Sequence, residues 1–108
     1  MVEERRRHPR AACHIRVEYG QPGAKVVARA IATNISQGGL KARASLRPTI
    51  ESGEVLPMTL FLEDGPVKVK ARIVYCNPDT FAVSFHGLDN DASCRLDELV
   101  FRANAFRR

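Results

Sequence analysis

Apolar and polar residues alternate along most of the chain, which is the period of a strand with one buried face. The first alternation runs from Ala11 to Tyr19, and the clearest runs from Val67 to Tyr75, where basic residues separate the apolar ones. The remaining strands are predicted at residues 25–33, 40–44, 56–63 and 81–85. The pattern therefore predicts six strands.

Turn-forming residues separate these segments. Gly and Pro residues at 20–23, Asp64-Gly65 and Asn77-Pro78-Asp79 are typical of tight turns, and Asp-Gly is a strong hairpin signal. Residues 45–55 indicate a longer loop. The polar segment 34–39 is predicted to connect the second and third strands.

The alternation leaves one side chain undecided. Arg29 shares the parity of Val27 and Ile31, so it faces either a barrel mouth or the solvent, and a shift of one residue reverses the choice. Tyr75 falls on the core parity of its strand.

Only the C-terminal segment has a helical period. Leu96, Leu99, Val100 and Ala103 follow i, i+3, i+4, i+7 spacing, which predicts a helix over about residues 91–106. Asp89 or Asp91 could form the N-cap. Arg107 and Arg108 suit the C-terminal end of the helix dipole. The expected fold is an all-β, six-stranded antiparallel β-barrel with one C-terminal α-helix, which covers one opening or packs on an edge.

The length of 108 residues and the 44% hydrophobic content suit one soluble domain, expected over residues 11–108 after a flexible basic arm at 1–10. No segment approaches the ~20 apolar residues of a membrane span. The N-terminus is charged where a signal peptide would be apolar, so we expect a cytoplasmic protein without membrane insertion.

Three cysteines stand at Cys13, Cys76 and Cys94, far apart and without a C-x-x-C pair. This favours buried thiols in a reducing compartment over disulfides or a zinc site. We expect no metal and no cofactor.

The formal net charge is +5, and arginine supplies 13 of the 17 basic residues. Arginine presents a planar fork of donors that fits phosphate oxygens and guanine edges, so this bias favours shaped recognition of an anion. Arg6 and Arg10 are four residues apart in the basic arm, with Arg5 and Arg7 beside them. A solvated basic tail is the alternative.

A second polar segment could face those arginines. Asn34 and Ser36 project to one side if the chain is extended, and Gly38-Gly39 allows close approach of backbone to a ligand. The alternative is an ordinary turn in which both side chains bond to local backbone.

Together the two segments, R-x-x-x-R at Arg6 and Arg10 and [DN]-x-S-x-x-G at Asn34, Ser36 and Gly39, resemble the PilZ domain. The resemblance runs from residue 4 to the terminal helix. It implies a six-stranded β-barrel that binds the bacterial second messenger cyclic di-GMP.

The resemblance also assigns roles. Arg6 and Arg10 would hold phosphates and guanines from the flexible arm. An arginine at the place of Arg5 tends to accompany a stacked ligand dimer in the family, which implies two ligand molecules per site.

On the barrel side, Asn34, Ser36, Gly38 and Gly39 would form the other wall and contact a guanine. The family accepts Asp or Asn at the first of these positions. The amide of Asn34 lacks the charge and second acceptor oxygen of a carboxylate, which weakens this contact.

The leading hypothesis is a sensor in which cyclic di-GMP orders the arginine arm over the barrel and an unidentified partner protein reads the changed surface. The alternative is a nucleic-acid-binding barrel with a basic arm. It is disfavoured because aromatic residues make up only 6% of the chain and Phe81, Phe85 and Tyr75 fall on core parities.

An enzyme is not expected. His8, His14 and His86 lack a neighbouring nucleophile and metal-ligand spacing. Ser36 lacks the strand–turn–helix context of a hydrolase nucleophile.

Overall fold

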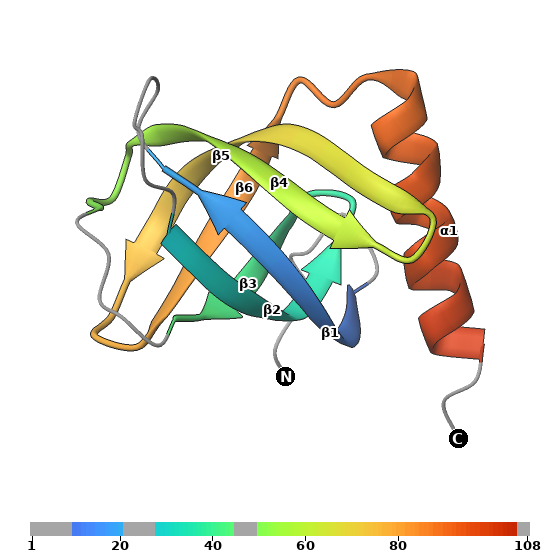
Figure 1. Cartoon of the computed structure of the whole chain (residues 1–108), viewed down its shortest axis with the longest axis horizontal. Coiled ribbons are helices and arrows are strands. Elements are labelled where there is room, and N and C mark those ends of the chain that lie inside the picture. The colour runs from blue at the N-terminus through green and yellow to red at the C-terminus, as the bar shows by residue number, and fades with distance from the viewer. Residues whose placement is uncertain (1–9, 21–27, 45–49, 106–108) are drawn as a thin grey trace, which may run out of the picture.

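The computed structural model describes residues 10–20, 28–44 and 50–105. The elements are β1 (Arg10–Tyr19), β2 (Ala28–Ser36), β3 (Gly39–Arg43), β4 (Val55–Leu62), β5 (Gly65–Cys76), β6 (Thr80–His86) and α1 (Asn90–Ala105). The strands pair antiparallel and close into a barrel in the order β1-β2-β3-β6-β5-β4 (Figure 1). This confirms the predicted six-stranded barrel with one C-terminal helix.

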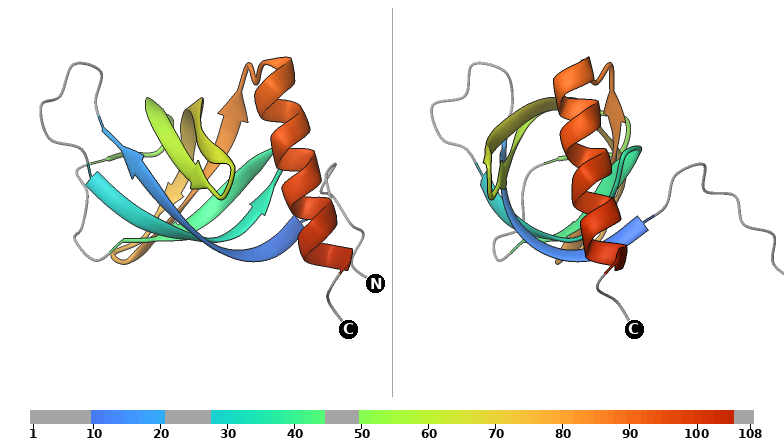
Figure 2. Two further views of the ribbon diagram at one scale, coloured as in Figure 1. Left: turned by 45° about the vertical axis from the view of Figure 1, so that its right-hand side comes forward. Right: turned by 90° about the vertical axis from the view of Figure 1, so that its right-hand side faces the viewer.

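Helix α1 lies across one end of the barrel (Figure 2). Its apolar stripe of Ala92, Leu96 and Val100 is buried, and the helix contacts β1, β2 and β5. The backbone N–H of Ala92 donates to Oδ1 of Asp89 over 2.8 Å, so Asp89 is the N-cap. The sequence had left Asp89 and Asp91 as alternatives.

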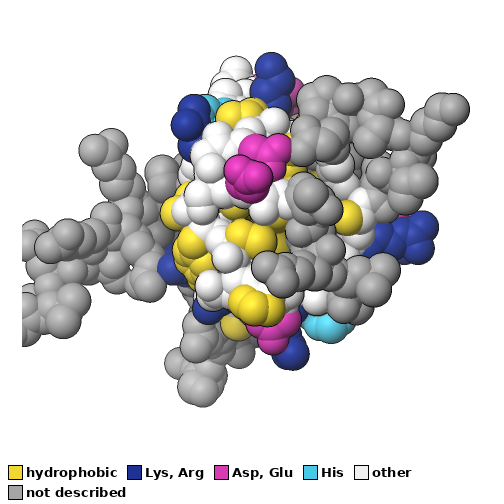
Figure 3. Space-filling model, turned by 90° about the vertical axis from the view of Figure 1, so that its left-hand side faces the viewer, with side chains coloured by type: hydrophobic (Ala, Val, Ile, Leu, Met, Phe, Trp, Pro, Cys, Tyr) yellow, Lys and Arg dark blue, Asp and Glu magenta, His cyan; other side chains and the backbone are white. Residues whose placement is uncertain are grey.

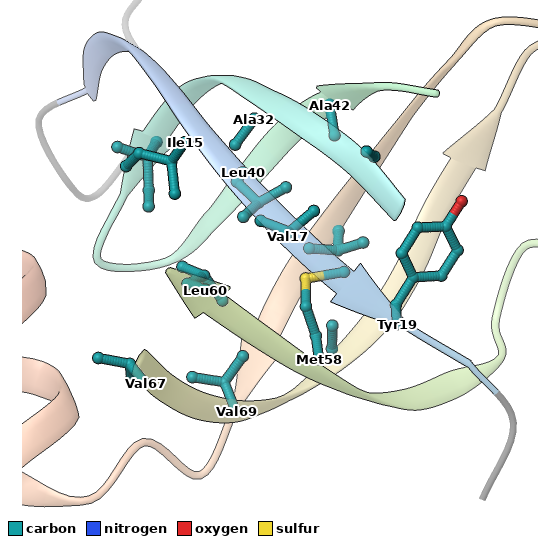
Figure 4. Close-up of a cluster of buried hydrophobic side chains, with 14 of the residues drawn as sticks. Ile15, Val17, Tyr19, Ala32, Leu40, Ala42, Met58, Leu60, Val67 and Val69 are labelled. Carbon is teal, nitrogen blue, oxygen red and sulfur yellow. The ribbon is translucent and has the colours of Figure 1, made fainter. Parts of the chain in front are cut away.

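Every second residue of the strands faces inward, and these side chains form the core of the barrel. Val17, Ala32 and Leu60 are fully buried, and Figure 4 shows them with their neighbours inside the ring of strands. The rings of Tyr19 and Phe81 lie 5.0 Å apart between centroids. On the barrel end that faces away from α1, hydrophobic side chains lie in the middle of the described surface and basic side chains at its edges (Figure 3).

Strand β5 contains an irregularity that changes the face of Tyr75. The register with β6 shifts between Ile73 and Tyr75, and Tyr75 pairs with Ala82. Tyr75 is 37% exposed, so its predicted core position is wrong. A bulge inserts one residue and reverses the parity beyond it, which a regular alternation cannot show. Phe81 is buried as predicted, and Phe85 packs against the core partly buried.

Strand β2 ends later than predicted. It continues to Ser36, whose Cα partner on β1 is Arg10, so only residues 37 and 38 connect β2 to β3. The buried side chain of Ile35 explains the extension, because it carries the core into this part of the strand. Arg10, expected in the arm, is the first residue of β1.

The start of the predicted second strand, residues 25–27, lies outside the described residues. The open question about Arg29 is settled: its side chain is exposed and Nε lies 3.4 Å from Oε2 of Glu18.

The cysteines are less buried than expected. Cys13 and Cys76 are partly buried, and Cys94 is exposed because it lies off the buried stripe of α1. The Cys13 thiol donates to the carbonyl of Ala32 over 3.3 Å. Burial raises the pKa of Cys13 from 9.0 to about 11.

Within the described ranges, no helix is long and apolar enough to cross a membrane. The same residues contain no group of three His, Cys, Asp or Glu side chains placed to hold a metal ion.

Candidate functional site

The pairing of β1 with β2 brings the two sequence motifs together on the outside of the barrel. Arg10 lies opposite Ser36, and Ala12 lies opposite Asn34. Nε of Arg10 donates to Oδ1 of Asn34 over 2.8 Å, with both side chains partly buried. One arginine of the motif is therefore fixed against the polar segment. Arg5 and Arg6 lie outside the described residues.

Ser36 is the one buried polar residue among those described, with 8% of its surface exposed. Its hydroxyl accepts from the backbone N–H of Gly38 over 3.0 Å and donates to the carbonyl of Gly39 over 3.4 Å. The local-turn alternative thus holds for Ser36, whereas Asn34 bonds across the strands. These two bonds stabilise the turn that follows Asn34.

Gly39 allows β3 to approach β6 closely. A Cβ at Gly39 would lie 2.1 Å from the carbonyl oxygen of Val83, which excludes any larger residue without movement of the backbone. The carbonyl of Gly38 accepts from the N–H of Phe85 over 2.9 Å. The lack of a side chain at Gly39 therefore has a role in the barrel itself, separate from any contact with a ligand.

A row of outward-facing residues extends the site across the sheet. Asn34 pairs with Lys41 on β3, Lys41 pairs with Ala82 on β6, and Ala82 pairs with Tyr75 on β5. Directly paired residues project to the same face. The small side chain of Ala82 leaves the surface low between Lys41 and Tyr75. Sequence reasoning missed Lys41 and Tyr75, because only the strand register places them beside the motif.

The helix is fastened to both motifs. Nε2 of Gln37, in the turn between β2 and β3, donates to Oγ of Ser93 over 2.5 Å and to the Ser93 carbonyl over 3.3 Å. Near the other end of α1, Nδ2 of Asn104 donates to the carbonyl of Arg10 over 3.3 Å. No local pattern in the sequence signals these bonds, which span 56 and 94 residues.

A third contact holds the helix to the β4–β5 hairpin. Arg95 donates to Oδ1 of Asp64 over 2.7 Å and to the carbonyl of Gly65 over 2.6 Å. The guanidinium of Arg95 lowers the pKa of Asp64. Because the guanidinium of Arg95 already bonds Asp64 and Gly65, it serves the fold and is not part of the candidate site.

The fold and the site together define a class: a small closed β-barrel with a helix across one end and an arginine–amide pair on its outer face. The profile of the PilZ domain family matches residues 4–102, and the chain belongs to this family.

Solved structures with the same fold include proteins of this kind. The inhibitor of motility MotI/DgrA of Bacillus subtilis superposes with a TM-score of 0.83 at 18% identity, over 98% of this chain and 54% of that one. The PilZ domain of YcgR from Escherichia coli with c-di-GMP gives 0.80 at 13% identity, over 94% and 93%. The complex of K. pneumonia MrkH with c-di-GMP gives 0.76 at 18% identity, over 96% and 53%.

The chain spans about half the length of MotI/DgrA and MrkH, and nearly all of the isolated YcgR domain. At these identities the likeness establishes the fold. No curated protein matches the sequence.

Proposed function

We propose that this PilZ domain is a receptor for cyclic di-GMP. The observation that carries the proposal is the 2.8 Å hydrogen bond from Nε of Arg10 to Oδ1 of Asn34, which joins the two halves of the binding motif. Two structural relatives, the YcgR PilZ domain and MrkH, are described in complex with c-di-GMP.

The chemistry of the site suits a dianionic ligand that carries guanine. The guanidinium of Arg10 can pair with phosphate oxygens or with O6 and N7 of guanine. The ammonium of Lys41 adds positive charge next to Asn34. The exposed ring of Tyr75, two strands beyond Lys41, offers a face on which a purine can stack. Arg5 and Arg6 complete the site from the segment before β1.

The proposed output is a change at the surface around α1. Ligand binding orders residues 1–9 over the barrel, starting from Arg10, whose carbonyl accepts the hydrogen bond from Asn104 of α1. The turn with Gln37 is bonded to Ser93 of the same helix. Both motifs therefore contact α1, and we propose that an unidentified partner protein reads the helix and the ordered arm. No chemical step is part of this function.

The number of ligand molecules follows from Arg5. Its place before the first motif arginine favours a stacked pair of cyclic di-GMP molecules. The row from Asn34 to Tyr75 crosses four strands, or about 14 Å at the usual strand spacing, which gives room for more than one guanine.

Isothermal titration calorimetry with cyclic di-GMP tests the proposal, with GTP and a short single-stranded oligonucleotide as controls. We expect saturable binding of cyclic di-GMP, two molecules per chain, and no saturable binding of either control. Absence of binding by cyclic di-GMP would overturn the proposal. One molecule per chain would overturn the stacked pair alone.

The oligonucleotide control addresses the alternative function, since the exposure of Tyr75 removes one argument against it. Oligonucleotide binding that weakens steeply with salt, without binding of cyclic di-GMP, would favour a nucleic-acid-binding barrel.

A further inference from the structure

The outer face of β5 carries a row of cations. Lys68, Lys70 and Arg72 alternate with buried residues, so all three project outward. Alternate residues of a strand are about 6.7 Å apart, which sets the spacing of the charges. β4, β5 and β6 contain no acidic residue. The row is therefore a one-sign surface rather than part of a mixed network.

Lys68 and Lys70 line a groove of about 680 Å³ formed by β4, β5, the end of β6 and the segment that precedes α1. Pro57 lies opposite Lys70, and Val55 lies opposite Arg72, so apolar side chains flank the charged row. Val55 is 42% exposed. The lining also includes Lys68 and, at its edge, Asp89, whose carboxylate accepts the capping N–H of Ala92. The groove thus combines an apolar wall with a cationic one.

Lys68 and Lys70 have no ion-pair partner among the residues that the structure describes. The ion pairs of the described residues involve Arg29, Arg95 and Arg102, and neither Lys68 nor Lys70 pairs with a described acid. Arg72 donates instead to Nε2 of His86, over 3.0 Å. Like charges in neighbouring positions repel, so an anionic partner would relieve an existing cost.

We propose that this β5 groove binds an extended acidic segment of a partner protein, with carboxylates at alternate positions and apolar residues among them. Such a segment repeats its carboxylates at the same interval as the cations. Because the barrel is closed, no free strand edge is offered and recognition proceeds through side chains.

Two other partners fit the groove less well. The described residues that line it include no Phe, Tyr or Trp, and the imidazole of His86 accepts a hydrogen bond from Arg72, so the bases of a nucleic acid would find little stacking surface there. A membrane surface is flat and would leave the apolar wall of a groove unfilled.

The surface borders the candidate nucleotide site without sharing its motif residues. Arg72 pairs with Ser84, and Ser84 pairs with Gly39. The proposed partner site therefore does not depend on nucleotide binding. Because the two sites are adjacent, a segment bound in the groove would lie next to a bound nucleotide.

The test measures fluorescence anisotropy with a fluorescein-labelled peptide in which Glu alternates with Val or Ser, without nucleotide and at about 50 mM salt. The same peptide with Gln in place of Glu is the matched probe, and a labelled oligothymidylate is the third. We expect binding of the Glu peptide, weakened by added salt, and at least about tenfold weaker binding of the Gln peptide.

The variant K68Q/K70Q is expected to weaken the Glu peptide at least about tenfold. Arg29→Gln is the control, since it removes an exposed cation from β2, which lies across the barrel from β5. We expect Arg29→Gln to leave peptide affinity within about twofold.

Equal affinity for the Gln peptide, an equal effect of Arg29→Gln, or tighter binding of the oligothymidylate would overturn the inference. Calorimetry with cyclic di-GMP separates the two proposals, because K68Q/K70Q is expected to retain the affinity of the unsubstituted chain for the nucleotide.

Discussion

Arg10 and Asn34 are 24 residues apart in the chain, yet Nε of Arg10 lies 2.8 Å from Oδ1 of Asn34. The bond depends on the register of β1 with β2, which places Ala12 opposite Asn34 and Arg10 opposite Ser36. It holds the arginine along the outer face of the barrel instead of leaving it to sample many rotamers. Part of the entropy cost of ligand binding is therefore met when the domain folds.

Replacement of Asn34 tests this preorganisation. Asn34→Ala removes the acceptor of Arg10, and we expect the affinity for cyclic di-GMP to fall by about 1.5–3 kcal/mol, the usual range for a hydrogen bond with a charged partner. Asn34→Asp keeps the acceptor and adds a negative charge, so it should bind at least as tightly as the unsubstituted chain. Calorimetry measures both, and equal affinities of the alanine variant and the original would contradict the role of this pair.

The exposed ring of Tyr75 gives a second prediction. Tyr75→Ala should weaken the binding of cyclic di-GMP by about 1–3 kcal/mol if a guanine stacks there, and Tyr75→Phe should retain the affinity. Val74→Ala is the matched control, because Val74 is the neighbouring residue and is 54% exposed. If Tyr75→Ala and Val74→Ala behave alike, the site ends before β5.

The barrel could be predicted because one face of nearly every strand is buried, so apolar and polar residues alternate along the sequence. The run from Val67 to Ile73 shows it clearly, with every second residue buried. The helix could also be predicted, from the i, i+3, i+4, i+7 spacing of Leu96, Leu99, Val100 and Ala103, of which Leu96 and Val100 are buried. Both signals are local, and each recurs over several residues of one element.

The rest depended on irregularities and distant contacts. Register shifts occur between Ala12 and Ile15, between Ala32 and Asn34, and between Ile73 and Tyr75. The shift in β5 turns Tyr75 to the outside, and a strict period of two does not predict such a change. The predicted site residues Arg10 and Asn34 do meet. Lys41 and Tyr75 lie in the same row only because of the register between strands, which the sequence pattern does not reveal.

Gly39 is predicted to be essential for stability. In Gly39→Ala the new Cβ would meet the Val83 carbonyl oxygen, and a backbone atom cannot rotate away, so β3 and β6 must separate. We expect the free energy of unfolding to fall by about 2–4 kcal/mol. This corresponds to a loss of about 10–20 °C in Tm for a domain of this size.

Gly87→Ala is the control for that variant. Gly87 has a φ of 59° and open space around its Cβ position, so alanine there should cost only about 1–2 kcal/mol of backbone strain. Thermal unfolding followed by circular dichroism compares the two. An equal loss of Tm in both variants would show that the contact with Val83 relaxes.

The thiols should differ in reactivity. Burial raises the pKa of Cys13 to about 11, which leaves about one thiolate in a thousand at pH 8, whereas Cys94 is exposed on α1. Iodoacetamide should therefore modify Cys94 well before Cys13, as mass spectrometry of digests would show. Faster modification of Cys13 would contradict the protection expected from its partial burial and its hydrogen bond to Ala32.

The same shift predicts a pH dependence of stability. Because the folded pKa of Cys13 lies above its ordinary value of 9.0, the neutral thiol favours folding fully below pH 9, and this contribution is lost as pH rises through about 11. Cys13→Ala should flatten the decline in this window, measured by urea unfolding at several pH values. A decline of the same steepness in the variant would assign it to other groups.

The last prediction concerns the transmission of the signal to α1. Gln37 is bonded to Ser93, and Asn104 is bonded to the carbonyl of Arg10, so the helix is held by both motifs. We expect cyclic di-GMP to change the amide hydrogen exchange of residues 90–105 in the unsubstituted chain. Gln37→Ala and Asn104→Ala should each reduce that change while nucleotide affinity stays within about fivefold, since each side chain is engaged in a hydrogen bond between the helix and the barrel.

Arg102→Ala provides the matched control for this experiment. Arg102 pairs with Glu98 within the same helix, so its loss removes a helix contact without touching either motif. We expect the nucleotide-dependent exchange of α1 to be retained in Arg102→Ala. If Gln37→Ala and Asn104→Ala retain it as fully, the hydrogen bonds between the motifs and α1 do not carry the signal, and the readout lies in the ordered arm alone.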